Sequence, residues 1–107
     1  MKKDLRLSEL CDLYGQLLTP RQREIITGYY DYDLSLAEIS ENYGITRQAV
    51  RDAIVKASEQ LSYYEEILGV YRERERVLAL SREIISLIDE GDIVSAKQKA
   101  SQLIGKV

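Results

Sequence analysis

Five polar residues that follow Gly44 have side chains suited to contacting nucleic acid. They are Thr46, Arg47, Gln48, Arg51 and Lys56. Arginine pairs with guanine edges or with phosphate, and glutamine pairs with adenine. We therefore predict that this set of residues binds nucleic acid. The alternative interpretation is that these residues form only a solvated helix face.

A helix, a tight turn and a second helix are predicted around Gly44, in the stretch SLAEISENYGITRQAV. Glycine adopts the positive φ that such a turn needs without strain. Ser40 is small enough to permit close approach of the second helix. Apolar residues that would pack the two helices together recur on both sides of the turn: Ile39, Tyr43, Ile45, Val50, Ala53 and Ile54. This pattern indicates a helix-turn-helix, and the start of its second helix is the part that enters the major groove in such motifs.

The charge balance limits how strongly these residues could hold nucleic acid. The chain has 15 basic and 18 acidic residues, which gives a net charge of -3. Asp52 stands beside Arg51, and no segment is broadly basic. Non-specific affinity for DNA comes mainly from neutralising phosphates. We therefore expect any contact to be local and weak, or to need a second copy of the chain.

The other apolar residues also recur at helical spacing, which predicts an all-α fold. A first helix is expected over 4–18, a second from Pro20 with Thr19 as its cap, a third over 36–43 and a fourth from Arg47 to the YYEEILG segment. We predict a helix-turn-helix domain over 1–69, followed by a C-terminal helical hairpin over 70–107 that turns at Gly91. The hairpin is expected to pack on the first domain or to form a dimer interface. Gly69 is either a boundary or part of one long helix.

The amino-acid types exclude several kinds of chemistry. The chain has no histidine and a single cysteine, Cys11, which removes histidine-based catalysis, disulfide frameworks and multi-cysteine zinc sites. We interpret Cys11 as a core residue, and the paired carboxylates Glu65–Glu66 and Asp89–Glu90 as helix-surface charges. No cofactor, no metal site and no enzymatic activity are expected.

The N-terminal stretch MKKDLRLSEL lacks the apolar core of a signal peptide. No apolar run approaches the roughly 18 residues that a membrane-spanning helix needs. We therefore expect a cytoplasmic protein that does not enter a membrane.

Three stretches resemble a known family: LYGQLLTPRQ, YYDYDLSLAEISENYGITRQAVRD and YYEEILG. They cover about residues 7–69, and they resemble region 4 of sigma factors and, more closely, the YlxM family. YlxM proteins are small bacterial helix-turn-helix regulators associated with the signal recognition particle. The resemblance implies an all-α protein with a sigma-region-4-like module and a regulatory link to the particle's GTPase, its receptor or its RNA.

The sequence departs from the YlxM pattern inside the second helix of the motif. Arg51 stands where the family typically has an aromatic residue after RQAV, and Val55 and Lys56 stand where a basic pair usually follows the isoleucine. The first change adds positive charge to the exposed face, and the second removes some.

Two functions remain open from the sequence. The first is a regulator that binds DNA or the particle's RNA through the second helix of the motif. The second is a protein-interaction adaptor that binds the particle's GTPase or its receptor without contacting nucleic acid. The amphipathic C-terminal hairpin predicts a homodimer, because its apolar face would need a cover.

Overall fold

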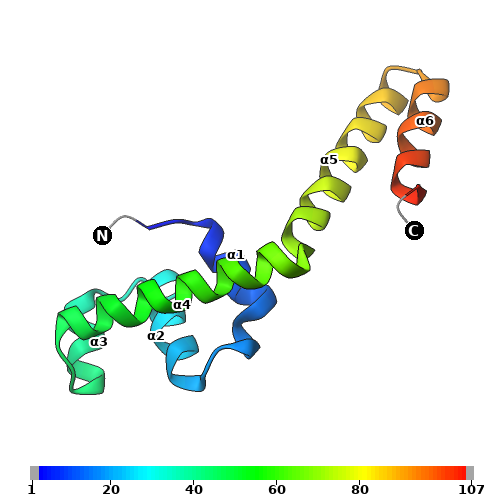
Figure 1. Cartoon of the computed structure of the whole chain (residues 1–107). Coiled ribbons are helices and arrows are strands. Elements are labelled where there is room, and N and C mark those ends of the chain that lie inside the picture. The colour runs from blue at the N-terminus through cyan, green and yellow to red at the C-terminus, as the bar shows by residue number, and fades with distance from the viewer. Residues whose placement is uncertain (1–2, 106–107) are drawn as a thin grey trace. The chain divides into compact units, whose positions relative to one another are not determined.

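The computed structural model describes residues 3–105, and these residues form only helices and the turns between them (Figure 1). The all-α prediction is therefore confirmed. The chain divides into two compact units, unit 1 up to Tyr71 and unit 2 from Arg72. The helices in chain order are α1 (Arg6–Tyr14), the 3₁₀ turn η1 (Gly15–Leu17), α2 (Pro20–Tyr30), α3 (Leu36–Tyr43), α4 (Arg47–Leu68), α5 (Val70–Asp89) and α6 (Ile93–Ile104).

The first helix is shorter than the predicted span of 4–18. It ends at Tyr14, and Gly15–Leu17 tighten into a 3₁₀ turn before Leu18 becomes extended. Glycine is a weak helix former, and Thr19 precedes a proline, which disfavours helical backbone at that residue. The chain therefore leaves the helix before the predicted end and re-enters one at Pro20.

Side-chain caps fix the starts of α2 and α3. Thr19 accepts from the N–H of Gln22, and the Gln22 side chain accepts from the N–H of Thr19. Ser35 and Glu38 form the same reciprocal pair at the start of α3. Each capping box satisfies two backbone donors that a helix N-terminus would otherwise leave unpaired. The predicted starts at Pro20 and Leu36 are confirmed.

The core of unit 1 consists of two clusters that share α4. The first joins α1, α2 and the middle of α4, and the second joins α2, α3 and the start of α4. Their fully buried members include Leu10, Ile26 and Leu61 in the first cluster, and Ile39 and Ile54 in the second. One 22-residue helix thus carries apolar contacts to α1, α2 and α3.

Glu65 is buried, which makes its interpretation as a surface charge wrong. Its side chain is 5% exposed, and its Oε1 accepts from the Tyr14 hydroxyl at 2.7 Å and from the Tyr71 N–H at 2.9 Å. The Tyr14 oxygen in turn accepts from the Val70 N–H at 3.1 Å. A buried carboxylate is tolerated when its oxygens are hydrogen-bonded. Its neighbour Glu66 is exposed, as predicted.

A left-handed glycine resolves the alternatives at Gly69. The residue has φ +63°, and its N–H donates to the carbonyl of Glu65 at 2.8 Å, which ends α4. α5 begins at the next residue, and Glu65 and Tyr14 accept its first two N–H groups. Gly69 therefore separates two helices and does not lie inside one.

Unit 2 is a helical hairpin formed by α5 from Arg72 onward and by α6. Gly91 has φ +82° in the connecting turn, and Asp92 caps α6 by accepting from the Ser95 N–H. Lys99 pairs with Glu83 at 3.2 Å across the hairpin. The predicted turn at Gly91 is confirmed.

Candidate nucleic-acid interface

Gly44 makes the turn between α3 and α4. It has φ +65° and ψ +34°, and the N–H groups of Gly44 and Ile45 both donate to the carbonyl of Ser40. A Cβ added at Gly44 would meet no atom within 4 Å. The glycine is therefore required by backbone conformation and not by lack of space.

Three buried residues pack the two helices of the motif against each other. Ile39 from α3 and Val50 and Ile54 from α4 are at most 1% exposed. The other apolar positions predicted around the turn, Tyr43, Ile45 and Ala53, are half-buried against this cluster. The predicted packing of the helix-turn-helix is confirmed, and it fixes which side of α4 faces outward.

The start of α4 presents the predicted residues Arg47, Gln48 and Arg51 to solvent. Thr46 is the cap of the helix, and its hydroxyl oxygen accepts from the Ala49 N–H at 3.0 Å. Its O–H can still donate to an external acceptor such as a phosphate oxygen. Arg47 and Arg51 stand one helical turn apart, so both guanidinium groups can reach the same ligand.

The side chain of Gln48 is hydrogen-bonded to Asp52. The Gln48 amide Nε2 donates to the Asp52 carboxylate at 2.8 Å. Recognition of adenine by glutamine uses both the amide donor and the amide oxygen. The Gln48–Asp52 contact must therefore open before Gln48 can read a base, and Asp52 also repels phosphate.

Lys56 does not lie on the same face as the other predicted residues. At 3.6 residues per turn, it is about 140° round the helix from Arg51 and about 7 Å further along the axis. The structure thus brings Arg47, Gln48 and Arg51 together beside the cap Thr46, and it separates Lys56 from them. The spacing of five residues between Arg51 and Lys56 already predicts this separation from the helical period.

A further cation stands beside the motif. The guanidinium group of Arg21 lies 5.2 Å from the ring centre of Tyr43, the last residue of α3. The Tyr43 hydroxyl donates to Glu24 at 2.8 Å, and this hydrogen bond, helped by burial, raises the pKa of Tyr43. Sequence reasoning missed Arg21 because the ring contact joins residues far apart in the chain.

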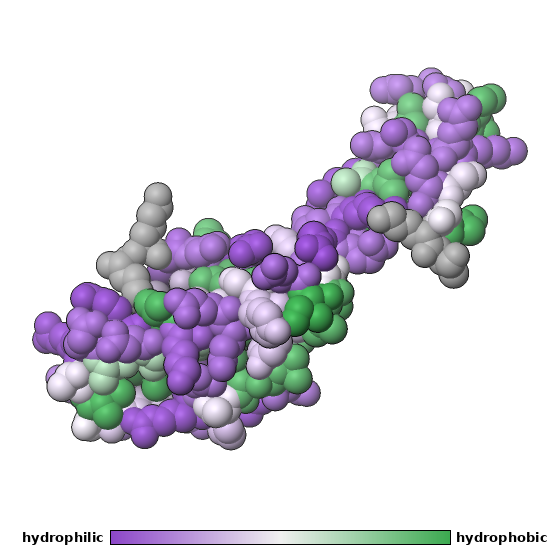
Figure 2. Space-filling view, viewed as in Figure 1, coloured by the Kyte–Doolittle hydropathy of each residue, from purple (hydrophilic) through white to green (hydrophobic). Residues whose placement is uncertain are grey.

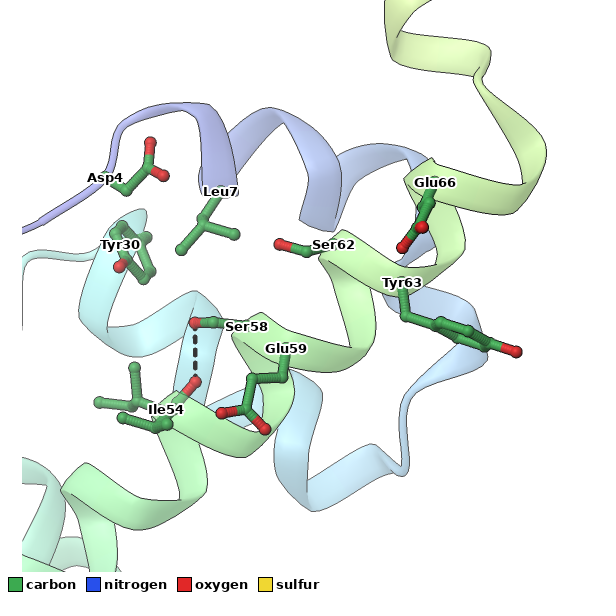
Figure 3. A pocket seen from close by; sticks show the side chains of 10 residues that line it. Asp4, Leu7, Tyr30, Ile54, Ser58, Glu59, Ser62, Tyr63 and Glu66 are labelled. Atoms are coloured by element: carbon green, nitrogen blue, oxygen red, sulfur yellow. Dashed lines mark hydrogen bonds between the residues drawn. The ribbon is translucent and has the colours of Figure 1, made fainter.

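The second half of α4 borders an acidic groove of about 480 Å³ (Figure 3). Its carboxylates are Asp4, Glu59 and Glu66, and its lining includes no lysine or arginine. Leu7 from α1, Tyr30 from α2 and Ile54 from α4 supply apolar surface, and the Ser58 hydroxyl is already used by the Ile54 carbonyl at 2.7 Å. The same helix is therefore cationic at its start and acidic along the groove.

Neither a metal site nor a reactive thiol is found in the described part of the chain. Residues 3–105 contain no group of three or more His, Cys, Asp or Glu side chains that could hold a metal ion. Burial is the main cause that raises the pKa of the Cys11 thiol, whose Sγ lies 3.7 Å from the Thr27 hydroxyl. A raised pKa keeps the thiol protonated and poorly reactive.

Within 3–105, none of the helices combines the length and the apolar character that crossing a membrane requires.

Comparisons with known proteins place the chain in one family. The family model described as "Putative helix-turn-helix protein, YlxM / p13 like" matches residues 1–103. A UPF0122 protein of Symbiobacterium thermophilum is 41% identical over 103 residues, which cover 96% of each chain. One of Desulforamulus reducens is 38% identical over 110 residues, covering 100% of this chain and 94% of the relative. The resemblance to YlxM proteins is thus confirmed, and the chain belongs to the UPF0122 family of YlxM- and p13-like helix-turn-helix proteins.

Proposed function

We propose that the protein is a cytoplasmic, non-catalytic regulator in the signal recognition particle pathway, and that it binds DNA through the start of α4. The observation that supports this proposal is the exposed group Arg47, Gln48 and Arg51, held at the outward side of a packed helix-turn-helix. The major groove of B-DNA admits an α-helix and presents the guanine and adenine edges that these side chains pair with. The link to the particle rests on the resemblance to YlxM proteins.

The particle's RNA is the second nucleic acid to test. The major groove of an A-form RNA helix is deep and narrow, so a protein helix does not enter it. Binding to this RNA would instead use its phosphates or unpaired loops. The shape of the motif therefore favours duplex DNA over RNA.

The test measures binding affinity at several salt concentrations. Fluorescence anisotropy of a labelled DNA duplex, and separately of the particle's RNA, reports the binding. Each neutralised phosphate contributes roughly -0.9 to the slope of log affinity against log salt for duplex DNA. If Arg47 and Arg51 each neutralise one phosphate, the slope is about -2 per protomer. The double substitution Arg47→Ala with Arg51→Ala should then weaken binding and flatten the slope by about two units.

The matched control is Arg6→Ala with Lys97→Ala, which removes two exposed positive charges from α1 and α6. This control should leave affinity and slope close to those of the unmodified chain. Lys56→Ala tests the other face of α4. It should weaken nucleic-acid binding less than the substitution of either arginine. The proposal is wrong if neither nucleic acid binds at 50 mM salt, or if the control and the arginine variant weaken binding equally.

A protein-interaction adaptor is the second candidate, and the acidic groove favours it. Glu59 and Glu66 flank apolar surface from Leu7 and Ile54, an arrangement that suits a basic amphipathic segment. Under this alternative the partner is the particle's GTPase or its receptor, and nucleic acid is not contacted. Glu59→Lys with Glu66→Lys should abolish co-purification with the purified partner, while Arg47→Ala with Arg51→Ala should leave it unchanged. The adaptor function is excluded if neither purified protein binds the unmodified chain.

A further inference from the structure

One side of α4 forms a wall of the acidic groove (Figure 3). Four residues of this wall follow one another at intervals of three, four and four positions, which keeps them on one side of the helix. They are Val55, Ser58, Ser62 and Glu66. The opposite wall comes from other parts of unit 1, namely Asp4, Leu7 and Tyr30. The groove therefore runs along α4 for about three turns.

The base of the groove is apolar. Leu7 and Ile54 line the groove although they are only 7% and 1% exposed, so they lie at its base. Ser58 and Ser62 are small, and Figure 3 shows Ser62 pointing toward Leu7. On the surface of unit 1, hydrophobic residues appear between hydrophilic ones (Figure 2). Because the Ser58 hydroxyl already donates to the Ile54 carbonyl, an apolar ligand side chain can cover it without leaving it unpaired.

The rim of the groove carries only negative charge. Its carboxylates belong to Asp4, Glu59 and Glu66, and no lysine or arginine is among the lining residues. Within residues 3–105, the exposed Glu59 and Glu66 take part in no hydrogen bond or ion pair. Asp4 accepts from the backbone N–H of Arg6 at 3.0 Å, which leaves its charge in place. Such a rim attracts cations and repels phosphate, so it favours a basic protein segment over nucleic acid.

The spacing of two carboxylates favours a helix as the form of that segment. Glu59 and Glu66 are seven residues apart, which is about 10.5 Å along α4 and about 20° round it. A helix lying along α4 presents its own residues at positions seven apart with the same separation. In a β-strand, residues on one side are instead about 6.6 or 13 Å apart. Two basic residues of a helix therefore match both carboxylates at once.

We propose that the groove binds an amphipathic helix of a partner protein, whose basic residues seven positions apart pair with Glu59 and Glu66. Apolar side chains of the same helix lie on Leu7 and Ile54. Exposed ion pairs contribute little each, so the apolar contact supplies most of the affinity and the carboxylates select the partner. The site rests on the adaptor function considered above for the existence of a protein partner, and it adds that partner's helical form and charge pattern.

A synthetic 18-residue peptide, whose helix is confirmed by circular dichroism, is the probe. It carries leucines at positions 5, 9 and 12, lysines at positions 4, 6, 11 and 13, and alanine or glutamine elsewhere. The lysines form two pairs, each seven positions apart, on the two sides of the leucine stripe. A control peptide of the same composition has its lysines at positions 3, 7, 10 and 14, opposite the leucines. Fluorescence anisotropy should show micromolar binding of the probe and at least tenfold weaker binding of the control peptide.

Matched substitutions in the full chain test the two carboxylates. Glu59→Gln with Glu66→Gln should weaken binding of the probe at least threefold, because two ion pairs are lost. Glu41→Gln with Glu75→Gln removes the same charge from exposed positions of α3 and α5 and should leave the affinity unchanged.

A charge exchange keeps the test independent of lost stability. Glu59→Lys with Glu66→Lys should bind a third peptide, in which glutamates replace the four lysines, and should reject the lysine probe. Binding of the glutamate peptide would also show that the variant is folded.

Three results would overturn the proposal. Absence of probe binding at 500 μM would mean that a basic amphipathic helix is not the occupant. Equal binding of the two lysine peptides would reduce the attraction to net charge, and so would equal losses in the two double-glutamine variants. Failure of the charge exchange in a folded variant would place the contact elsewhere.

The same measurements separate this site from the adaptor function. Co-purification of the particle's GTPase or receptor without binding of the probe would reject the site and keep the function. Binding of the probe, when neither purified protein binds, would keep the site and reject those two partners.

Discussion

The phenol of Tyr14 donates a hydrogen bond of 2.7 Å to the buried carboxylate of Glu65, and this contact joins residues 51 positions apart in the chain. Tyr14 also accepts from the Val70 N–H. One side chain thus links the end of α1, the last turns of α4 and the first residue of α5.

Tyr14→Phe should destabilise unit 1 by about 1–3 kcal/mol, because it removes a donor from a buried carboxylate and an acceptor from the Val70 N–H. Urea unfolding followed by circular dichroism measures the change. Tyr32→Phe is the control, since Tyr32 is 74% exposed and its loss of a hydroxyl should have little effect. Equal midpoints for the two variants would contradict the importance of the Tyr14–Glu65 contact.

Stability should fall in alkaline solution partly through the same phenol. Burial, followed by the hydrogen bond to Glu65, raises the pKa of Tyr14 above its ordinary value of 10.0. The unfolded chain loses this proton first, so the contribution is complete below about pH 10 and is lost as pH rises through the folded pKa. The free energy of unfolding between pH 8 and 11 should therefore decline less steeply in Tyr14→Phe. Part of the decline should remain, because the pKa values of Tyr43 and Cys11 are also raised.

Gly44→Ala should cost roughly 1–2 kcal/mol, since a residue with a Cβ is strained at positive φ. Thermal unfolding of the variant measures this cost. Gly105→Ala is the matched control, because Gly105 follows α6 with φ -61°, which alanine adopts freely. An unchanged melting temperature in Gly44→Ala would mean that the turn relaxes to another conformation.

Asp52→Ala should raise affinity for duplex DNA by roughly threefold. The substitution releases the Gln48 amide from its 2.8 Å bond and removes a negative charge that opposes phosphate. Anisotropy titrations at 50 mM salt measure the effect. Glu41→Ala is the control, as it removes one exposed carboxylate from α3 on the other side of the turn. A gain of the same size in both variants would assign the effect to net charge and not to Gln48.

Local rules of the sequence were enough to place the motif. Ser35 and Thr46 cap helices through atoms three residues away, and Gly44 ends α3 by its own conformation. Such signals need no knowledge of distant residues, so the bounds 36–43 and the start at Arg47 are confirmed.

Long-range contacts were beyond the same reasoning. A glutamate such as Glu65 is normally a surface residue. The packing of α1 on α4 brings Tyr14 next to it, and the Tyr14 hydroxyl then supplies the hydrogen bond that a buried carboxylate needs. The contact between Arg21 and Tyr43 depends in the same way on how α2 meets α3. The separation of Lys56 from Arg51 is not a long-range contact. The helical period of the sequence alone predicts that the two side chains lie on different faces of α4.

α4 is unbroken from the cap at Thr46 to the left-handed Gly69. The 18 residues that separate Arg47 from Glu65 span about 27 Å of helix. A tilt of about 5° at the Glu65 end, conveyed without bending, would carry Arg47 sideways by about 2 Å, which is enough to make or break a base contact. A rigid α4 would thus couple the position of Glu65 to that of Arg47. In the proposed complex with DNA, an event that loosens the Tyr14–Glu65 contact would therefore displace Arg47 relative to the groove.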